Sequence, residues 1–163
     1  RAAGLRLLAM GLERSVPNWR KLVKDTALWN MQKGLDLSAD ELMNSELARS
    51  HIYENMVNFF DEYDVLVLPA AQVPPFDKDL PWVKEINGVQ MQTYIDWMAA
   101  CCMVSVTGLP CVSVPGGFSN CGLPIGVQLV GKPRGDLELL RIAHLFEQAN
   151  HGANRKPDLS NIG

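Results

Sequence analysis

The chain has 163 residues, enough for one domain, with a formal net charge of −3 at pH 7 and a pI near 5.6. A chain with this charge lacks the excess of basic residues that is typical of nucleic-acid-binding proteins. No apolar run approaches the roughly 20 residues that span a bilayer. No P-loop or G-x-G-x-x-G occurs, and the four cysteines share no zinc-ligand spacing with histidine. We therefore expect a cytoplasmic protein with reduced thiols that uses no cofactor and no metal.

The N-terminal third is predicted to be mainly helical. Apolar periodicity predicts a helix over residues 2–13 and a second over residues 18–32, with Gly34 as the terminator of the second. The sequence begins at Arg1, without Met and already inside the first apolar pattern. From that start we expect a piece of a longer polypeptide.

A capping box predicts the start of a third helix. In Ser38-Ala39-Asp40-Glu41, the Ser38 hydroxyl can accept a hydrogen bond from the Glu41 amide, while the Glu41 carboxylate reaches back to the amide of Ser38. The helix should run to about Phe60. Its apolar positions recur with a period near 3.6, which predicts that one face packs on a sheet.

The middle of the chain alternates between strand and loop patterns. Residues 65–68 form a continuous apolar run, which predicts a strand buried on both faces. Residues 69–82 hold four prolines and little periodicity, so they form either a functional loop or a surface excursion. Asn87-Gly88 favours a two-residue type I′ hairpin. Residues 92–106 are apolar on nearly every side, which predicts a deeply buried helix.

Two Gly-Leu-Pro tripeptides introduce the next two strands. We expect short strands over residues 111–114 and 125–130, separated by Pro115-Gly116-Gly117 and Ser119-Asn120. Replacement of Gly116 or Gly117 by alanine is expected to lower the stability of the protein, whereas replacement of Ser119 or Asn120 by alanine should be nearly neutral.

A last helix is predicted over residues 137–150, with Asp136 as its cap and a polar tail after His151. Five of its residues are expected to face inward: Leu139, Leu140, Ile142, Ala143 and Phe146. Three thiols are expected to act as small, buried apolar side chains, namely Cys101, Cys102 and Cys111.

The residue types alone identify no self-contained active site. A Cys–His nucleophile needs a thiol beside an imidazole, and nothing in the sequence ties Cys111 or Cys121 to a histidine. Ser113 lies inside a strand pattern without the G-x-S-x-G elbow of a serine hydrolase. Reasoning from residues therefore stops at an α/β domain without its own catalytic set.

Three ordered segments carry a resemblance to a known family. They read YDVLVLPA at residues 63–70, TGLPCVSVP at residues 107–115 and GLPIGVQLVG at residues 122–131. In order and spacing they resemble the C-terminal motifs of amidase-signature enzymes. The resemblance implies a layered α/β/α fold with a mixed β-sheet. It also implies that residues 1–163 form a single unit, which is the C-terminal fragment of a larger amidase domain. Within this unit we expect residues 1–60 to be mainly helical, residues 61–150 to be α/β, and residues 151–163 to be a tail.

The same resemblance implies hydrolysis of a carboxylic amide by a serine nucleophile, assisted by a lysine and a second serine. The Gly/Ser-rich segment that carries these groups in the family does not occur in this sequence. We therefore place the nucleophile outside this chain, name no catalytic residue, and expect the chain alone to be inactive. The resemblance marks Tyr94, Asp96 and Trp97 as substrate-binding candidates. Core packing is the alternative for Tyr94 and Trp97, and a solvated helix position for Asp96.

The expected partners are a small-molecule amide substrate and the N-terminal remainder of the same polypeptide, with a homo-oligomer left open and no nucleic acid or membrane. Two alternative functions remain. One is a catalytically inactive scaffold or interaction module. The other is the A subunit of the tRNA-dependent amidotransferase, although residues 97–102 lack the asparagine-containing run usual before Gly-Leu-Pro in that protein.

Overall fold

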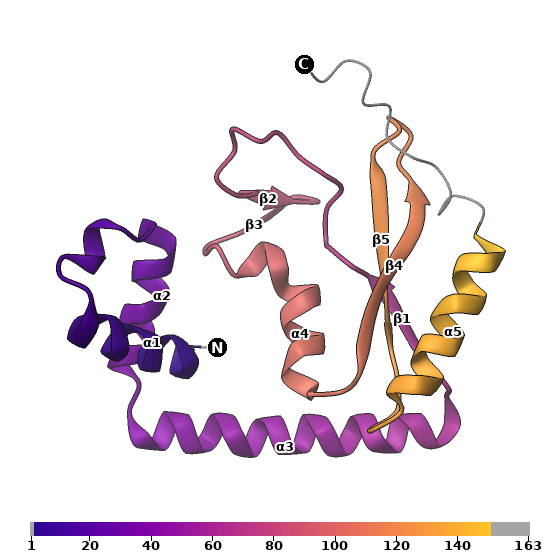
Figure 1. The fold of residues 1–163 in the computed structure, drawn as a ribbon, viewed down its shortest axis with the longest axis horizontal. Helices are drawn as coiled ribbons and strands as arrows, with labels where there is room; N and C mark the ends of the chain where they lie inside the picture. Colours follow the sequence, from indigo (N-terminus) through magenta and orange to yellow (C-terminus); the bar gives the residue numbers. More distant parts are fainter. Residues whose placement is uncertain (1, 151–163) are drawn as a thin grey trace. The chain divides into compact units, whose positions relative to one another are not determined.

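The computed structural model describes residues 2–150, and the predicted tail, residues 151–163, lies outside this range. Contacts divide the chain between His51 and Ile52 into two compact units, which are considered separately below. Figure 1 shows the order of the elements along the chain. That the whole chain acts as one domain stays a prediction.

The first unit is helical, as predicted. Its elements are α1 (Ala2–Ser15), a 3₁₀ turn η1 (Trp19–Lys21), α2 (Asp25–Asp36) and the first part of α3 (Ala39–Glu62). A small core holds them together, with Ala9, Trp19 and Met31 each at most 4% exposed. Burying these apolar side chains is the main favourable term for so small a unit.

The prediction of one helix over residues 18–32 is wrong. Asn18 has φ 55°, in the left-handed region, and lies outside any helix. Lys24, inside the predicted range, is extended with φ −60° and ψ 145°, and a helix cannot continue through that conformation. The chain makes only the short η1 turn, and α2 begins anew at Asp25, whose carboxylate lies at the favourable end of the helix dipole. Gly34 does not end this helix either: it lies buried inside α2.

The capping box at the start of α3 is confirmed. The Ser38 amide donates to Glu41 Oε2 at 2.8 Å, and the Glu41 amide donates to Ser38 Oγ at 3.2 Å. The helix continues to Glu62, two residues beyond the predicted end. The two reciprocal bonds satisfy amides that have no partner inside the helix.

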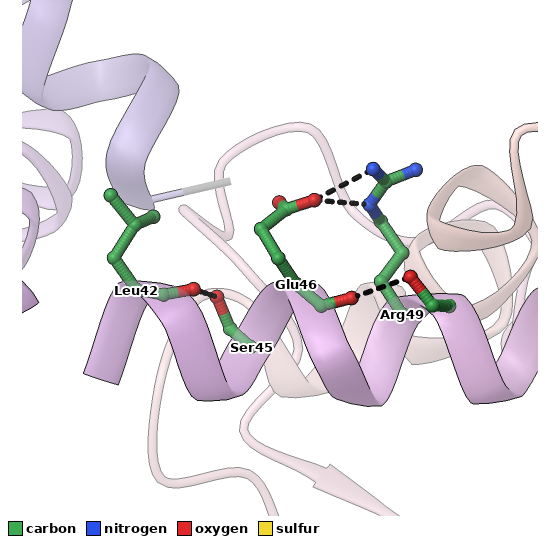
Figure 2. Close-up of polar contacts among 5 residues, drawn as sticks. Leu42, Ser45, Glu46 and Arg49 are labelled. Carbon is green, nitrogen blue, oxygen red and sulfur yellow. Dashed lines mark hydrogen bonds and ion pairs between the residues drawn. The ribbon is translucent and has the colours of Figure 1, made fainter. Parts of the chain in front are cut away.

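Local polar contacts line the first half of α3 (Figure 2). Ser45 Oγ donates to the Leu42 carbonyl at 2.7 Å, Ser50 Oγ donates to the Glu46 carbonyl at 3.0 Å, and Arg49 donates twice to Glu46 Oε2 at 2.6 and 3.0 Å. These pairs lie three or four residues apart, the spacing at which helix side chains meet.

The prediction that the whole apolar face of α3 packs on a sheet is wrong. Leu42, Met43 and Leu47 are 40%, 60% and 58% exposed, and only the end of the helix, with Met56, Phe59 and Phe60, joins the core of the second unit.

The second unit contains a three-stranded antiparallel sheet. Its order is β1 (Leu66–Pro69), β5 (Pro124–Val130) and β4 (Cys111–Phe118), with β5 in the centre. Every pairing in this sheet of the described residues is antiparallel. With the surrounding helices, the sheet confirms the predicted α/β class. The described part of the sheet is antiparallel, so a mixed sheet stays a prediction for the whole domain.

Helices cover both faces of this sheet, as a layered α/β/α fold requires. On one face, Val130 packs with Phe60 of α3 and with Val104 of α4 (Ala99–Thr107). On the other face, Leu129 packs with Leu139 of α5 (Asp136–Ala149). Because successive strand residues point to opposite faces, β5 contributes to both layers of the core.

Two details of the strands differ from the predictions. β1 is not buried on both faces in this chain, because Val67 is 52% exposed while its neighbours are partly covered. Pro115, Gly116 and Gly117 do not separate the strands but lie inside β4, where the register shifts at a bulge. A glycine in a strand often marks such a bulge.

The predicted hairpin at Asn87-Gly88 is confirmed. Strands β2 (Glu85–Ile86) and β3 (Val89–Gln90) pair directly across it, and φ is 49° at Asn87 and 79° at Gly88. A type I′ turn requires positive φ at both central residues.

The helix predicted over residues 92–106 is shorter and less buried than expected. A 3₁₀ turn, η2 (Asp96–Met98), precedes α4, and Met103 on α4 is 69% exposed. The sheet covers only one side of α4, so an apolar composition all round does not bury every side chain. The expectation of buried thiols is likewise wrong for Cys101 and Cys111, which are exposed.

The last helix is confirmed with two corrections. Gly135, not Asp136, occupies the N-cap position of α5, and no side chain caps it. Leu139 and Ala143 are buried as predicted, but Leu140 is 56% exposed. One residue corresponds to a 100° rotation on a helix, which turns Leu140 away from the line through Leu139 and Ala143.

Candidate active-site wall

The candidate site begins where β1 ends. The Ala70 amide donates to the Gly126 carbonyl at 3.0 Å, which extends the β1–β5 ladder by one residue into the loop. Gly126 permits this approach, because a Cβ there would lie 3.0 Å from Ala70 Cβ and 3.4 Å from Ser113 Oγ. A larger residue would push the loop away from the sheet.

A cavity of about 400 Å³ lies beside this junction. Its walls come from the loop after β1, from η2 and from the start of β5, and none of its lining residues carries a charge. They are Ala70, Ala71, Val73, Pro74, Pro75, Phe76, Trp97, Pro124, Ile125 and Gly126. Largely apolar concave sites with few polar groups are typical of small-molecule pockets.

Aromatic side chains build one side of this cavity. Phe76 and Trp97 meet edge to face, with ring centroids 5.4 Å apart, and Tyr94 meets Trp97 in the same manner at 6.0 Å. Trp82 lies 6.5 Å from Tyr94, and Lys84 Nζ lies 3.3 Å from the Trp82 centroid. Such edge-to-face contacts restrain the rings that form the wall.

The structure places the three predicted site residues in different roles. Trp97 lines the cavity. Tyr94 supports Trp97 from behind and is not among the lining residues. Asp96 uses its carboxylate locally, since it accepts from the Thr93 amide and from Thr93 Oγ1, both at 2.8 Å. Contact of any of them with a substrate stays a prediction.

The hydrogen bonds from Thr93 also affect the charge of Asp96. The bond from the Thr93 side chain, followed by that from its amide, lowers the pKa of Asp96 below its ordinary value of 3.8. The pair resembles a capping box, in which a threonine and an acidic residue three positions later close the start of a helix. The carboxylate thus serves as a structural acceptor at the start of η2.

Three further side chains position this site and were missed from the sequence. Gln128 is only 6% exposed in the middle of the sheet, and its Nε2 donates to the Pro69 carbonyl at 2.9 Å. Gln72 Oε1 accepts from the Ala100 amide at 3.0 Å, and Cys101 Sγ donates to the Ala70 carbonyl at 2.9 Å. Gln128 could have been flagged as a polar residue in an apolar run, because buried amides need partners.

The remaining nucleophilic side chains are engaged elsewhere. Cys111 Sγ lies 3.7 Å from Gln128 Oε1, and partial desolvation of the thiol, on a residue that is exposed as a whole, raises its pKa. Cys121 Sγ lies 3.0 Å from Ser119 Oγ, a contact that lowers the pKa of Cys121. His144 contacts Gln148 on α5. These contacts pair neither thiol with His144. That this chain holds no catalytic residue stays a prediction.

Two findings on the described part of the chain bear on other site types. No helix within residues 2–150 is long and apolar enough to cross a membrane. Within the same range, no group of three or more His, Cys, Asp or Glu side chains could hold a metal ion.

The Amidase family model matches residues 10–140, a stretch that includes every wall of the cavity. The chain belongs to the amidase family. Among curated members, a putative amidase of Synechocystis sp. is 37% identical over 101 residues, which cover 62% of this chain and 20% of that protein. The A subunit of the glutamyl-tRNA(Gln) amidotransferase from Geotalea daltonii is 34% identical over 117 residues, covering 72% and 23%.

Solved amidase structures share the fold. A bacterial aryl acylamidase of the amidase-signature family aligns with a TM-score of 0.75 at 23% identity, over 96% of this chain and 34% of that one. A 6-aminohexanoate cyclic dimer hydrolase aligns with a TM-score of 0.73 at 22% identity, over 98% and 35%. These comparisons confirm the resemblance to amidase-signature enzymes. The chain spans only about a fifth to a third of the lengths of these amidase relatives.

Proposed function

We propose that the full protein containing this chain hydrolyses a carboxylic amide, with a serine nucleophile located outside residues 1–163. The chain contributes one wall of the pocket that holds an apolar part of the substrate. The observation that carries this proposal is the position of Trp97, a residue selected from the sequence, on an uncharged cavity at the junction of β1 and β5. Membership of the amidase family supplies the reaction type.

The composition of the cavity supports an uncharged substrate group. A charged group moved into an apolar pocket loses hydration that no lining side chain replaces. Aliphatic or aromatic groups gain about 25 cal/mol for each Å² of apolar surface removed from water. We therefore favour amides whose acyl or amine portion is neutral and apolar. The proposed location is the cytoplasm, and assembly into a homo-oligomer is left open.

Trp97→Phe in the full-length protein tests this assignment. The indole Nε1 of Trp97 is enclosed and has no hydrogen-bond acceptor among the described residues, so phenylalanine removes an unpaired donor and keeps an aromatic ring. The smaller ring enlarges the pocket. With acetyl, butyryl and hexanoyl 4-nitroanilides as probes, kcat/KM should shift toward the longer acyl groups by about tenfold, the scale of one or two methylenes.

The controls separate the candidate functions. Trp29→Ala alters a tryptophan on α2 that is 39% exposed and should leave chain-length preference unchanged. A full-length protein that hydrolyses no amide would contradict the proposal and favour the inactive scaffold. An unchanged preference in an active Trp97→Phe enzyme would remove Trp97 from the pocket.

A second candidate function rests on the comparison with Geotalea daltonii, whose matching protein is an amidotransferase A subunit. In that case the full protein would release ammonia from an amide and pass it to a partner protein. Ammonia release that requires added partner proteins would support this function, whereas activity of the purified protein alone supports a general amidase.

A further inference from the structure

The loop that forms one wall of the cavity accepts two hydrogen bonds from the first turn of α4. Gln72 in the loop accepts from the Ala100 amide, and Cys101 on α4 donates to the Ala70 carbonyl. The partners lie 28 and 31 positions apart in the chain. The two bonds therefore join segments that lie far apart in the sequence.

α4 needs an acceptor at this position. The first amides of a helix have no carbonyl partner within it, and the N-cap residue of α4, Met98, makes no side-chain cap bond. The Ala99 amide is satisfied by the Asp96 carbonyl of η2. The Ala100 amide is satisfied instead by Gln72, so a residue of the cavity loop acts as the cap of the helix that follows Trp97.

The same loop is attached to the sheet on its other side. The Ala70 amide donates to the Gly126 carbonyl, and Gln128 Nε2 donates to the Pro69 carbonyl. The loop is thus fixed to β5 at one end and to α4 through Gln72.

We propose that Gln72 is a positioning residue of the substrate pocket, which holds the loop at residues 70–76 against the η2–α4 wall and so sets the width of the cavity. This inference rests on the proposed function. Gln72 is not among the lining residues, so its replacement removes no direct contact with a bound group. Its effect acts through the position of the loop.

The two substitutions to compare are Gln72→Ala, which removes the acceptor, and Gln72→Glu, which keeps an oxygen at the same distance along the side chain. A carboxylate is favoured near a helix N-terminus, where it meets the partial positive charge of the helix dipole. Gln72→Glu should therefore restore the bond to Ala100. Gln148→Ala, on the exposed side of α5, serves as the matched glutamine control.

The experiment measures hydrogen exchange and steady-state kinetics on the full-length protein. In Gln72→Ala, amides in residues 70–76 and 98–104 should exchange about fivefold faster, the size expected for one net hydrogen bond. KM for hexanoyl 4-nitroanilide should rise by a similar factor, while KM for the acetyl compound and kcat for both change less than twofold. Gln72→Glu and Gln148→Ala should match the parent protein in both measurements.

Each outcome decides the inference. Unchanged exchange in Gln72→Ala would show that the bond does not hold the loop, whether or not the protein is active. Faster exchange with an unchanged KM for the hexanoyl compound would show that the loop does not set the pocket. A parent protein without amidase activity would overturn the proposed function and, with it, the pocket role of Gln72. The exchange data would then still show whether the Gln72–Ala100 hydrogen bond holds the loop against α4.

Discussion

Gly116 on β4 lies directly against Val127 on β5: a Cβ built on Gly116 would fall 2.5 Å from Val127 Cγ2 and 3.2 Å from the Ile125 carbonyl oxygen. Real Cβ atoms do not approach so closely. The absence of a side chain at Gly116 is therefore a requirement of the β4–β5 ladder and not of a turn.

Gly116→Ala should destabilise the chain by about 1–3 kcal/mol, since the added methyl group forces Val127 or the strand to move. Urea unfolding gives the free energy directly. Gly11→Ala is the matched control, because nothing lies within 4 Å of a Cβ at Gly11 in α1 and alanine favours helix. Equal stability of the two variants would contradict the close contact.

Gly117→Ala should also destabilise, but for a different reason. Gly117 has φ 135°, a conformation that L side chains rarely adopt, although nothing lies within 4 Å of a Cβ built there. We expect a cost on the order of 1 kcal/mol or more from backbone strain alone. The bulge should be lost first, so the hydrogen exchange of β4 next to Gly117 should rise. If Gly117→Ala had the same unfolding free energy as the parent protein, the bulge would not require the backbone conformation of Gly117.

Ser119→Ala should not be neutral, contrary to the expectation from sequence. Ser119 Oγ accepts from the Leu123 amide at 3.1 Å inside the turn between β4 and β5. Removing that acceptor should cost about 1 kcal/mol of unfolding free energy. Asn120→Ala in the same turn provides the comparison and should change stability by less than about 0.5 kcal/mol. Similar values for the two variants would remove Ser119 from the turn.

The capping box should make the first unit sensitive to acid. The bonds from the Ser38 amide and then the Ser38 hydroxyl lower the pKa of Glu41 below its ordinary value of 4.5. Because the folded pKa is depressed, ionised Glu41 stabilises the helix above about pH 4.5, and this stabilisation is lost as pH falls through the folded value. The difference in unfolding free energy between the parent and Glu41→Gln should shrink between pH 6 and 3. A constant difference would contradict the prediction.

The isolated chain of residues 1–163 should hydrolyse no simple amide, because it lacks the Gly/Ser-rich segment that carries the family's nucleophile. The measurement is release of 4-nitroaniline or ammonia by the purified chain. Turnover that survives repurification, and also the replacement of all four cysteines by alanine, would contradict it.

Features fixed by neighbouring residues were predictable from the sequence. The Ser38–Glu41 box and the Asn87-Gly88 turn each depend on the chemistry of a few adjacent positions. The extended backbone at Lys24 was not predictable, because the apolar pattern of residues 18–32 continues on both sides of it. Periodicity records which residues are apolar but not where the backbone leaves the helical region.

The candidate site was predictable only in part, since it is built from distant segments. Trp97 could be selected through the family resemblance, but its cavity also needs Phe76 and Ile125. Gln72 carries no local signal, since its partner amide lies 28 positions away and any acceptor of the right reach could serve. The burial of Leu42 and Met103 was overestimated, because an apolar side chain is buried only where other parts of the structure cover it.

The central position of β5 has a consequence for synthesis of the chain. β4 meets β5 across a short turn, with Phe118 opposite Pro124, whereas β1 pairs with β5 only after β2, β3, α4 and β4 have been made. Closing a long loop costs more chain entropy than closing a short one. Among the described strands, β1 therefore has no hydrogen-bonded neighbour while it leaves the ribosome, and it can pair with β5 only once residues 124–130 have been translated.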